Sequence, residues 1–348
     1  MLRRVLGPIF IAALCAVSLV GQNATDTLRF GVFSLFKPKY LVVRPAKNQV
    51  LLLTISKSSV PIDDEIVIRA AGEVLLVTAA GKSTHADSLL ISSRNGDAAD
   101  FMLKIPGKIS REFRGTLSIA ASHHQLVPVV EVGRELAVAI AVKAEAPPHA
   151  AMEALKAQAV VARSFYLGSK ERHQAFDFCD TTHCQLFKAL PAANEPAFRA
   201  AQETRGLVLH YQGAIVPAMF SANCGGRTRT LKQVGINSDA YPYYSVEDAY
   251  CERHAKHWQA HLSSPEAKAL AGSRSEHDRL VLGRKVGWNV VPGNNYEVKR
   301  ESDALVFEGR GSGHGLGLCQ QGASAMAGDG ASFREILAHY FPNTTVGE

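Results

Sequence analysis

The chain has 348 residues, which is enough for two domains because a single domain usually takes about 100–200 residues. Apolar residues make up 47% of the sequence and charged residues 20%, a composition that excludes extended disorder. The formal net charge of +6 gives weak attraction to acidic polymers, but no basic tract interleaved with aromatic side chains is present. We therefore expect a folded protein that does not bind nucleic acid.

The N-terminal segment predicts export from the cytoplasm. Arg3 and Arg4 precede the apolar run Val5–Ala13, and small residues follow it. We interpret residues 1–22 as a secretory signal peptide. The alternative is a membrane anchor, although the apolar stretch is shorter than the roughly 20 residues that span a bilayer. In both cases we expect the protein in the cell envelope, either in the periplasm or in the extracellular wall.

Residues 28–114 predict an antiparallel β-rich region. Short β-type runs continue to about Val142, and turn residues such as Gly72 and Gly81 separate them. The clearest runs are Val50–Ile55, Glu65–Ile68, Glu73–Val77 and Thr116–Ile119. No group of side chains in this region indicates a reaction, so we expect a scaffold.

Residues 115–345 predict a domain that mixes helices with strands. Ala146-Pro147-Pro148 interrupts the strands, and a helix is expected over Ala151–Glu171. Its apolar stripe at i, i+4, i+7 and i+11 consists of Leu155, Ala159, Ala162 and Tyr166. Near the C-terminus, Ser332 and Glu335 predict a capping box at the start of another helix. Because strands and helices do not alternate regularly, we expect an α+β fold.

A cluster of histidines and cysteines favours a metal ion. It consists of His173, Cys179, His183 and Cys184. Zinc prefers tetrahedral sulfur and nitrogen donors, and a site closed by four protein ligands is usually structural. The alternative is a disulfide between Cys179 and Cys184, which exported proteins commonly contain. The cysteines beyond the signal segment are odd in number, so at least one of them is not paired within the chain: Cys179, Cys184, Cys224, Cys251 and Cys319.

Glu145 and Glu153 are the candidate catalytic carboxyls, one just before the expected helix and one at its start. Cleavage of a glycosidic bond needs an acid that protonates the bridging oxygen, and burial can raise a glutamate pKa enough to keep that proton at neutral pH. Each residue also has a structural interpretation. Glu153 suits the first turn of a helix because of the helix dipole, and Glu145 suits an exposed loop.

The glycine-rich run Gly309–Gly317 indicates either a ligand-binding cleft or a tightly packed turn. It lacks the lysine and hydroxyl residue of a phosphate-binding loop, and its spacing does not match a dinucleotide fingerprint. Within a cleft, Arg310 and His314 would contact a sugar polymer. A similar backbone interpretation fits Asn223–Gly226. Motifs of serine hydrolases and zinc proteases are absent from the sequence.

Together these segments resemble the SpoIID/LytB family, which is named for a sporulation protein and for an enhancer of a wall amidase. Five blocks in order carry the resemblance, and they extend over about residues 115–345: Glu145–Tyr166, Cys179–Gln185, Phe220–Thr228, Tyr241–Asp248 and Gly309–Ala323.

The resemblance implies a lytic transglycosylase, a lyase that cuts between N-acetylmuramic acid and N-acetylglucosamine, preferably in glycan strands stripped of stem peptides. The muramic acid C6 hydroxyl attacks its own C1, and a 1,6-anhydro end forms without water. In the family the acid precedes a Glu-Ala-Leu-Lys motif by eight residues, which places the acid/base at Glu145, with Glu153 as the alternative. The sequence departs from the family pattern in reading Glu145-Ala146-Pro147 in place of Glu-Met-Pro, which bears on substrate positioning.

The resemblance also implies the other site residues. Family zinc sites resemble the cluster between residues 173 and 184, so a structural Zn²⁺ is expected there. Cys224 and Cys251 then remain as a candidate disulfide, and Cys319 as a buried thiol. The residues that match family positions lining the cleft are Arg163, Gln185, His314 and Gln320. For Arg163 the alternative is a structural charge on the helix.

The main alternative belongs to another functional class: a wall-binding module that stimulates a separate cell-wall amidase and cuts nothing. The presence of Glu145 favours the enzyme. A zinc hydrolase acting on peptides would need an open metal position, and four protein ligands argue against one. The expected partners are therefore peptidoglycan glycan strands and a cell-wall amidase.

Overall fold

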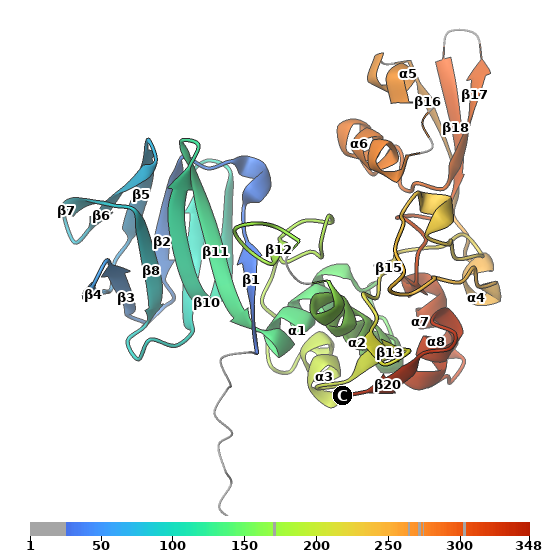
Figure 1. Ribbon diagram of the computed structural model, residues 1–348, viewed down its shortest axis with the longest axis horizontal. Coiled ribbons are helices and arrows are strands. Elements are labelled where there is room, and N and C mark those ends of the chain that lie inside the picture. Colours follow the sequence, from blue (N-terminus) through green and yellow to red (C-terminus); the bar gives the residue numbers. More distant parts are fainter. Residues whose placement is uncertain (1–25, 170–171, 264, 271–272, 274, 302–303) are drawn as a thin grey trace, which may run out of the picture.

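The computed structural model describes residues 26–348 except 170–171, 264, 271–272, 274 and 302–303 (Figure 1). The expected signal peptide, residues 1–22, lies outside the described residues. Among the helices of the described part, none is both long and apolar enough to cross a membrane.

The N-terminal part forms one curled sheet of 12 strands, drawn at the left of Figure 1. Its strands are β1 (Thr27–Gly31), β2 (Tyr40–Pro45), β3 (Leu51–Ile55), β4 (Ser58–Ile62), β5 (Ile66–Ala71), β6 (Val74–Ala79), β7 (Lys82–Ala86), β8 (Ser88–Ser93), β9 (Ala99–Ile105), β10 (Ile109–Ser122), β11 (Gln125–Gly133) and β12 (Phe178–Cys179). All pairs are antiparallel except β1 with β12. The β-type runs expected from the sequence are therefore confirmed.

Strand β10 changes partner along its length. Its first half pairs with β9, and its second half pairs with β11 and β8. Gly115 lies at this change, where a Cβ atom would overlap the carbonyl oxygen of Glu131. The domain boundary expected between residues 114 and 115 falls inside this strand.

The rest of the chain mixes helices with short strands, as expected for an α+β fold. Its helices are α1 (Arg134–Glu145), α2 (Met152–Gly168), α3 (Pro196–Glu203), α4 (Ala249–Glu252), α5 (Pro265–Leu270), α6 (Glu276–Val286), α7 (Gln320–Gly328) and α8 (Phe333–Tyr340). Its strands are β13 (Val208–Tyr211), β14 (Ala214–Ile215), β15 (Phe220–Ser221), β16 (His257–Leu262), β17 (Tyr296–Glu301), β18 (Ala304–Arg310), β19 (Leu318–Cys319) and β20 (Thr345–Gly347). The capping box at Ser332 and Glu335 is confirmed at the start of α8.

Helix α1 corrects the expectation that strands continue to Val142. Its residues from Ala137 to Val142 are all buried, because α1 packs against β1 and β11 as well as against α2 and α3. A helix that is apolar on every side lacks the amphipathic period that identifies a surface helix. Its valines and isoleucine therefore suggested a strand.

Helix α2 is buried on two faces. The expected stripe of Leu155, Ala159, Ala162 and Tyr166 is confirmed, and it packs into the core that includes the N-terminal sheet. The opposite face packs into a second core formed with α7 and α8, through Ala154, Ala157, Val160 and Val161. A third core lies between the sheet β16–β18–β17 and helices α5 and α6, at the upper right of Figure 1.

An ion pair joins α1 to α2 inside the protein. The Arg163 guanidinium donates from Nε and Nη2 to the two carboxylate oxygens of Glu135, at 2.9 and 2.5 Å. Arg163 also donates to the carbonyl oxygens of Ala201 and Leu207. Its side chain has no exposed surface, so these internal contacts hold it completely.

We expect Arg163→Met to lower the free energy of unfolding by about 3–5 kcal/mol, because it leaves the buried Glu135 carboxylate with only the longer contact to Nε of Arg134, at 3.8 Å. Urea unfolding at neutral pH, followed by circular dichroism, measures the change. The double variant Glu135→Met with Arg163→Met removes both charges and should recover part of the loss. Equal stability of wild type and the single variant would contradict the structural role.

Candidate active site

Glu145 is the last residue of α1, and two hydrogen bonds fix it. Its carboxylate Oε1 accepts from the backbone N–H of Leu186 at 2.9 Å. Its carbonyl oxygen accepts from Nε2 of Gln320 at 2.8 Å. Three distant segments, the end of α1, the loop after β12 and the start of α7, therefore meet at this glutamate.

Burial raises the pKa of Glu145 above its ordinary value, because the charged carboxylate loses solvation. The Leu186 N–H and the positive charge of Lys188 oppose this effect in part, since both favour the carboxylate. The balance keeps a proton on Glu145 to a higher pH than on an exposed glutamate. A general acid needs this property.

Glu153 has a structural environment. One carboxylate oxygen accepts from Nζ of Lys156 at 2.8 Å, and the other accepts from the backbone N–H of Phe333 at 2.8 Å. The hydrogen bond from Lys156 is the largest cause that lowers the pKa of Glu153, and the hydrogen bond from the Phe333 N–H lowers it further. Glu153 therefore stays ionised and ties α2 to the first turn of α8, which supports the structural interpretation.

The four residues expected to line a cleft have different surroundings. Arg163 is fully buried in its ion pair with Glu135, which supports its structural interpretation as a helix charge. Gln320 is buried and holds the Glu145 carbonyl, which makes it a positioning residue. Gln185 is also buried, and its Oε1 has no hydrogen-bond partner within the described part of the chain.

His314 is partly buried in the glycine-rich run. Its Nδ1 accepts from the backbone N–H of Leu316 at 3.0 Å. Burial lowers the pKa of His314 to about 4, and the positive charge of Arg229 acts in the same direction. His314 is therefore neutral at physiological pH, and it can donate or accept a hydrogen bond but carries no charge.

The glycines of this run serve close packing. A Cβ at Gly311 or Gly317 would overlap the carbonyl oxygen of Asn223 or Met219, and both glycines have positive φ. These contacts support the tightly packed turn. The neighbouring Arg310 lines an open hollow together with the aromatic side chains of Trp258 and Tyr296.

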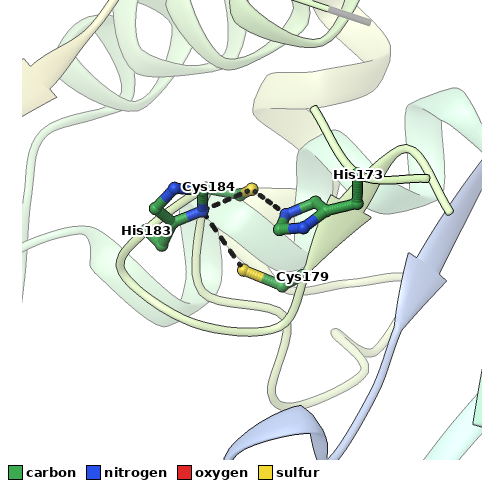
Figure 2. Close-up of side chains that lie close together, drawn as sticks. All are labelled: His173, Cys179, His183 and Cys184. Carbon is green, nitrogen blue, oxygen red and sulfur yellow. Dashed lines mark hydrogen bonds between the residues drawn. The ribbon is translucent and has the colours of Figure 1, made fainter. Parts of the chain in front are cut away.

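The histidine and cysteine cluster is assembled as the sequence suggested (Figure 2). The ligand atoms of His173, Cys179, His183 and Cys184 all lie within 4.8 Å of one another. Nε2 of His173 is 3.4 Å from the Cys184 sulfur. Nδ1 of His183 is 3.5 Å from the Cys184 sulfur and 3.8 Å from the Cys179 sulfur. All five cysteines of the described chain are free thiols.

The strand β12 fastens this cluster to the N-terminal sheet. Cys179 pairs with Gly31 across the parallel β1–β12 bridge. The next residue, Asp180, accepts from the Phe33 N–H and from Arg111, each at 3.0 Å. One end of the cluster is thus fixed, and the loop that follows it delivers Leu186 to Glu145.

Cys224 and Cys251, the candidate disulfide partners, lie in a second cluster. They are buried together with Cys319 and Asp248. The sequence analysis assigned Cys319 only as a buried thiol and gave Asp248 no role. The sequence did contain a hint that Asp248 lies near Cys251. Asp248 stands three residues before Cys251, and an aspartate at that spacing is a common N-cap, as it is for α4.

Comparisons with known proteins support the family resemblance, and the matched family model contains the first two of the five sequence blocks. Residues 122–211, which include Glu145 and the first cluster, match the family model described as SpoIID, Stage II sporulation protein. An uncharacterized protein of Brachyspira hyodysenteriae is 29% identical over 66% of this chain and 71% of its own length. Stage II sporulation protein D of Bacillus amyloliquefaciens is 25% identical over 60% of this chain and 72% of its own length.

A further relative is the amidase enhancer of Bacillus subtilis, which is 22% identical over 58% of this chain. The match spans 39% of the enhancer's own length. These relatives carry the two names from which the SpoIID/LytB family takes its own, so the comparisons support the resemblance of this chain to that family.

Proposed function

We propose that this protein is a lytic transglycosylase that cleaves peptidoglycan between N-acetylmuramic acid and N-acetylglucosamine, with Glu145 as acid and base. The family and the amidase-enhancer relative support a role at the cell wall. The environment of Glu145 carries the proposal of this specific reaction. Glu145 is a partly buried carboxyl with a raised pKa and a fixed backbone.

In the proposed reaction, the proton on Glu145 passes to the bridging oxygen as the bond from the muramic acid C1 to that oxygen breaks. The C6 hydroxyl of the same muramic acid then forms a bond to C1, and its proton passes to the Glu145 carboxylate. The acid is regenerated, no water is consumed, and the products are a 1,6-anhydro end and a free C4 hydroxyl on N-acetylglucosamine.

The Leu186 N–H has a part in this cycle. It holds Oε1 of Glu145, so we assign the transferable proton to Oε2. Because the same N–H stabilises the carboxylate, it also favours the state that follows proton transfer. Strands stripped of stem peptides are the proposed substrate, and an amidase is the class of enzyme that prepares them. A cell-wall amidase is therefore the proposed partner, outside the cytoplasm.

The first cluster fits a structural Zn²⁺. Tetrahedral coordination with ordinary Zn–S and Zn–N bond lengths places neighbouring ligand atoms about 3.4–3.8 Å apart. Three of the nitrogen–sulfur contacts here are 3.4, 3.5 and 3.8 Å, and all four ligand atoms lie within 4.8 Å of one another. The four side chains would close the coordination shell, so the ion would supply rigidity and no reactive water. Its role would be to hold the loop that carries Leu186.

Replacement of the acid tests the reaction. We expect Glu145→Gln to lower the release of anhydro-muramic ends from peptide-stripped strands by about 10²–10⁴-fold, because proton transfer contributes roughly that factor. Mass spectrometry identifies the ends. Glu153→Gln is the matched control and should keep most of the activity. Reducing ends from the wild type would indicate a hydrolase, and no products from any variant would favour the amidase-stimulating module.

The raised pKa of Glu145 predicts the pH dependence. The acid must be protonated, so kcat/KM should be full below that pKa and should fall as the pH rises through it. Lys188→Met removes a positive charge that lowers this pKa, so the alkaline limb should move to higher pH. Lys188→Arg keeps the charge and should not move it. An unchanged limb in Lys188→Met would contradict the assignment of Glu145.

Replacement of one ligand tests the zinc site of the first cluster. We expect the wild type to bind zinc through these residues, and Cys184→Ser should lose that ion and become more sensitive to trypsin at the flanking Arg172 and Lys188. Thr182→Ser, an exposed neighbour, is the control. Zinc content is measured by elemental mass spectrometry. A wild-type disulfide between Cys179 and Cys184, found by peptide mapping, would contradict the zinc site.

A further inference from the structure

The second cluster joins four side chains from separate segments in the C-terminal core. Cys224 follows β15, Asp248 caps α4, Cys251 lies within α4, and Cys319 caps α7. All four are buried, and their sulfur and carboxylate atoms lie within 4.8 Å of one another. The separation in sequence means that only the fold brings them together.

The Asp248 carboxyl is the most informative member, because its residue has 0% exposed surface. No lysine or arginine pairs with it in the described part of the chain. Its Oδ2 accepts from the Tyr340 hydroxyl at 2.7 Å and lies 3.3 Å from the Cys224 sulfur. Its Oδ1 accepts from the Cys251 N–H at 2.8 Å. A buried carboxylate without a cation is costly, and a bound metal ion is one way to offset that cost.

Backbone N–H groups point at the Cys319 sulfur. It accepts from the N–H of Cys224 at 3.3 Å and from the N–H of Gly322 at 3.4 Å. Hydrogen bonds of this kind orient thiolates that bind metals and reduce their charge. The start of α7, where Cys319 lies, adds the positive end of a helix dipole.

The packing around Asp248 requires a glycine at position 322. A Cβ at Gly322 would overlap both the Tyr340 hydroxyl and the Asp248 carboxylate. Only glycine at this position lets the carboxylate reach the first turn of α7 beside Cys319. The cluster is therefore built by close backbone approach as well as by the four ligands.

We propose that Cys224, Asp248, Cys251 and Cys319 bind a second Zn²⁺ ion in a closed, structural site. Three thiolates and one carboxylate supply four ligands, the number that structural zinc sites use. Three cysteines cannot all pair with one another in disulfides, whereas one ion engages all three. Soft sulfur donors favour zinc over calcium or magnesium, which prefer oxygen shells.

The site would fix elements that position Glu145. Cys319 directly precedes Gln320, whose side chain holds the Glu145 carbonyl. Asn223, directly before Cys224, exchanges two backbone hydrogen bonds with Ser312 of the glycine-rich run, at 3.2 and 2.8 Å. The ion would therefore join the glycine-rich run, α4 and α7 in a part of the chain that has little regular structure.

Zinc stoichiometry of the full-length chain, measured by elemental mass spectrometry, tests the proposal. We expect Cys319→Ser and Asp248→Asn each to bind one ion fewer than the wild type, with the first cluster still occupied. Cys184→Ser should also lose one ion, and a variant with both Cys184→Ser and Cys319→Ser should lose two. Ser324→Ala, on α7 beside the site, is the control and should bind as the wild type does.

Cobalt substitution of the wild type gives a second readout that needs no variant. Thiolate-to-cobalt absorption of the wild type should rise until two ions per chain are bound, and saturation at one ion per chain would overturn the proposal. Unchanged zinc content in both variants would overturn the proposal. So would a Cys224–Cys251 disulfide in the wild type, found by peptide mapping of alkylated thiols.

Discussion

Burial of α2 on both faces is the constraint on which the other parts of the fold depend. One face closes the core of the N-terminal sheet, and the other closes the core formed with α7 and α8. Each fully buried valine or leucine side chain contributes on the order of 1.5–3 kcal/mol through the hydrophobic effect. The sheet and the C-terminal core are thus tied to one helix, and elements packed against it have fixed positions relative to each other.

The position of α2 between the two cores also determines the surroundings of Glu145. This glutamate lies at the end of α1, which the Glu135–Arg163 ion pair joins to α2. The loop after β12 and the start of α7 reach it from opposite cores, through Leu186 and Gln320. A carboxyl held at such a junction is shielded from water without being paired to a cation, and this combination raises its pKa.

Local patterns in the sequence predicted the parts of the structure that local forces determine. The stripe of α2, the capping box of α8 and the turn glycines follow from periodicity and backbone geometry, and they are confirmed. Helix α1 was missed because it is apolar on every side. The ion pair of Arg163 was not predicted for a similar reason, since no local pattern shows that its partner is Glu135 on another helix. Contacts of this kind depend on tertiary packing.

The two cysteine clusters also differ in how far the sequence alone could predict them. His173, Cys179, His183 and Cys184 are neighbours in sequence, so their spacing alone predicted a common site. Cys224, Cys251 and Cys319 are distant in sequence, and elimination left only a candidate disulfide and a buried thiol. In an oxidising compartment, two thiols at this separation would tend to pair and leave the third alone. A shared ion would keep all three reduced, and it would account for both the odd number of cysteines and the buried Asp248 among them.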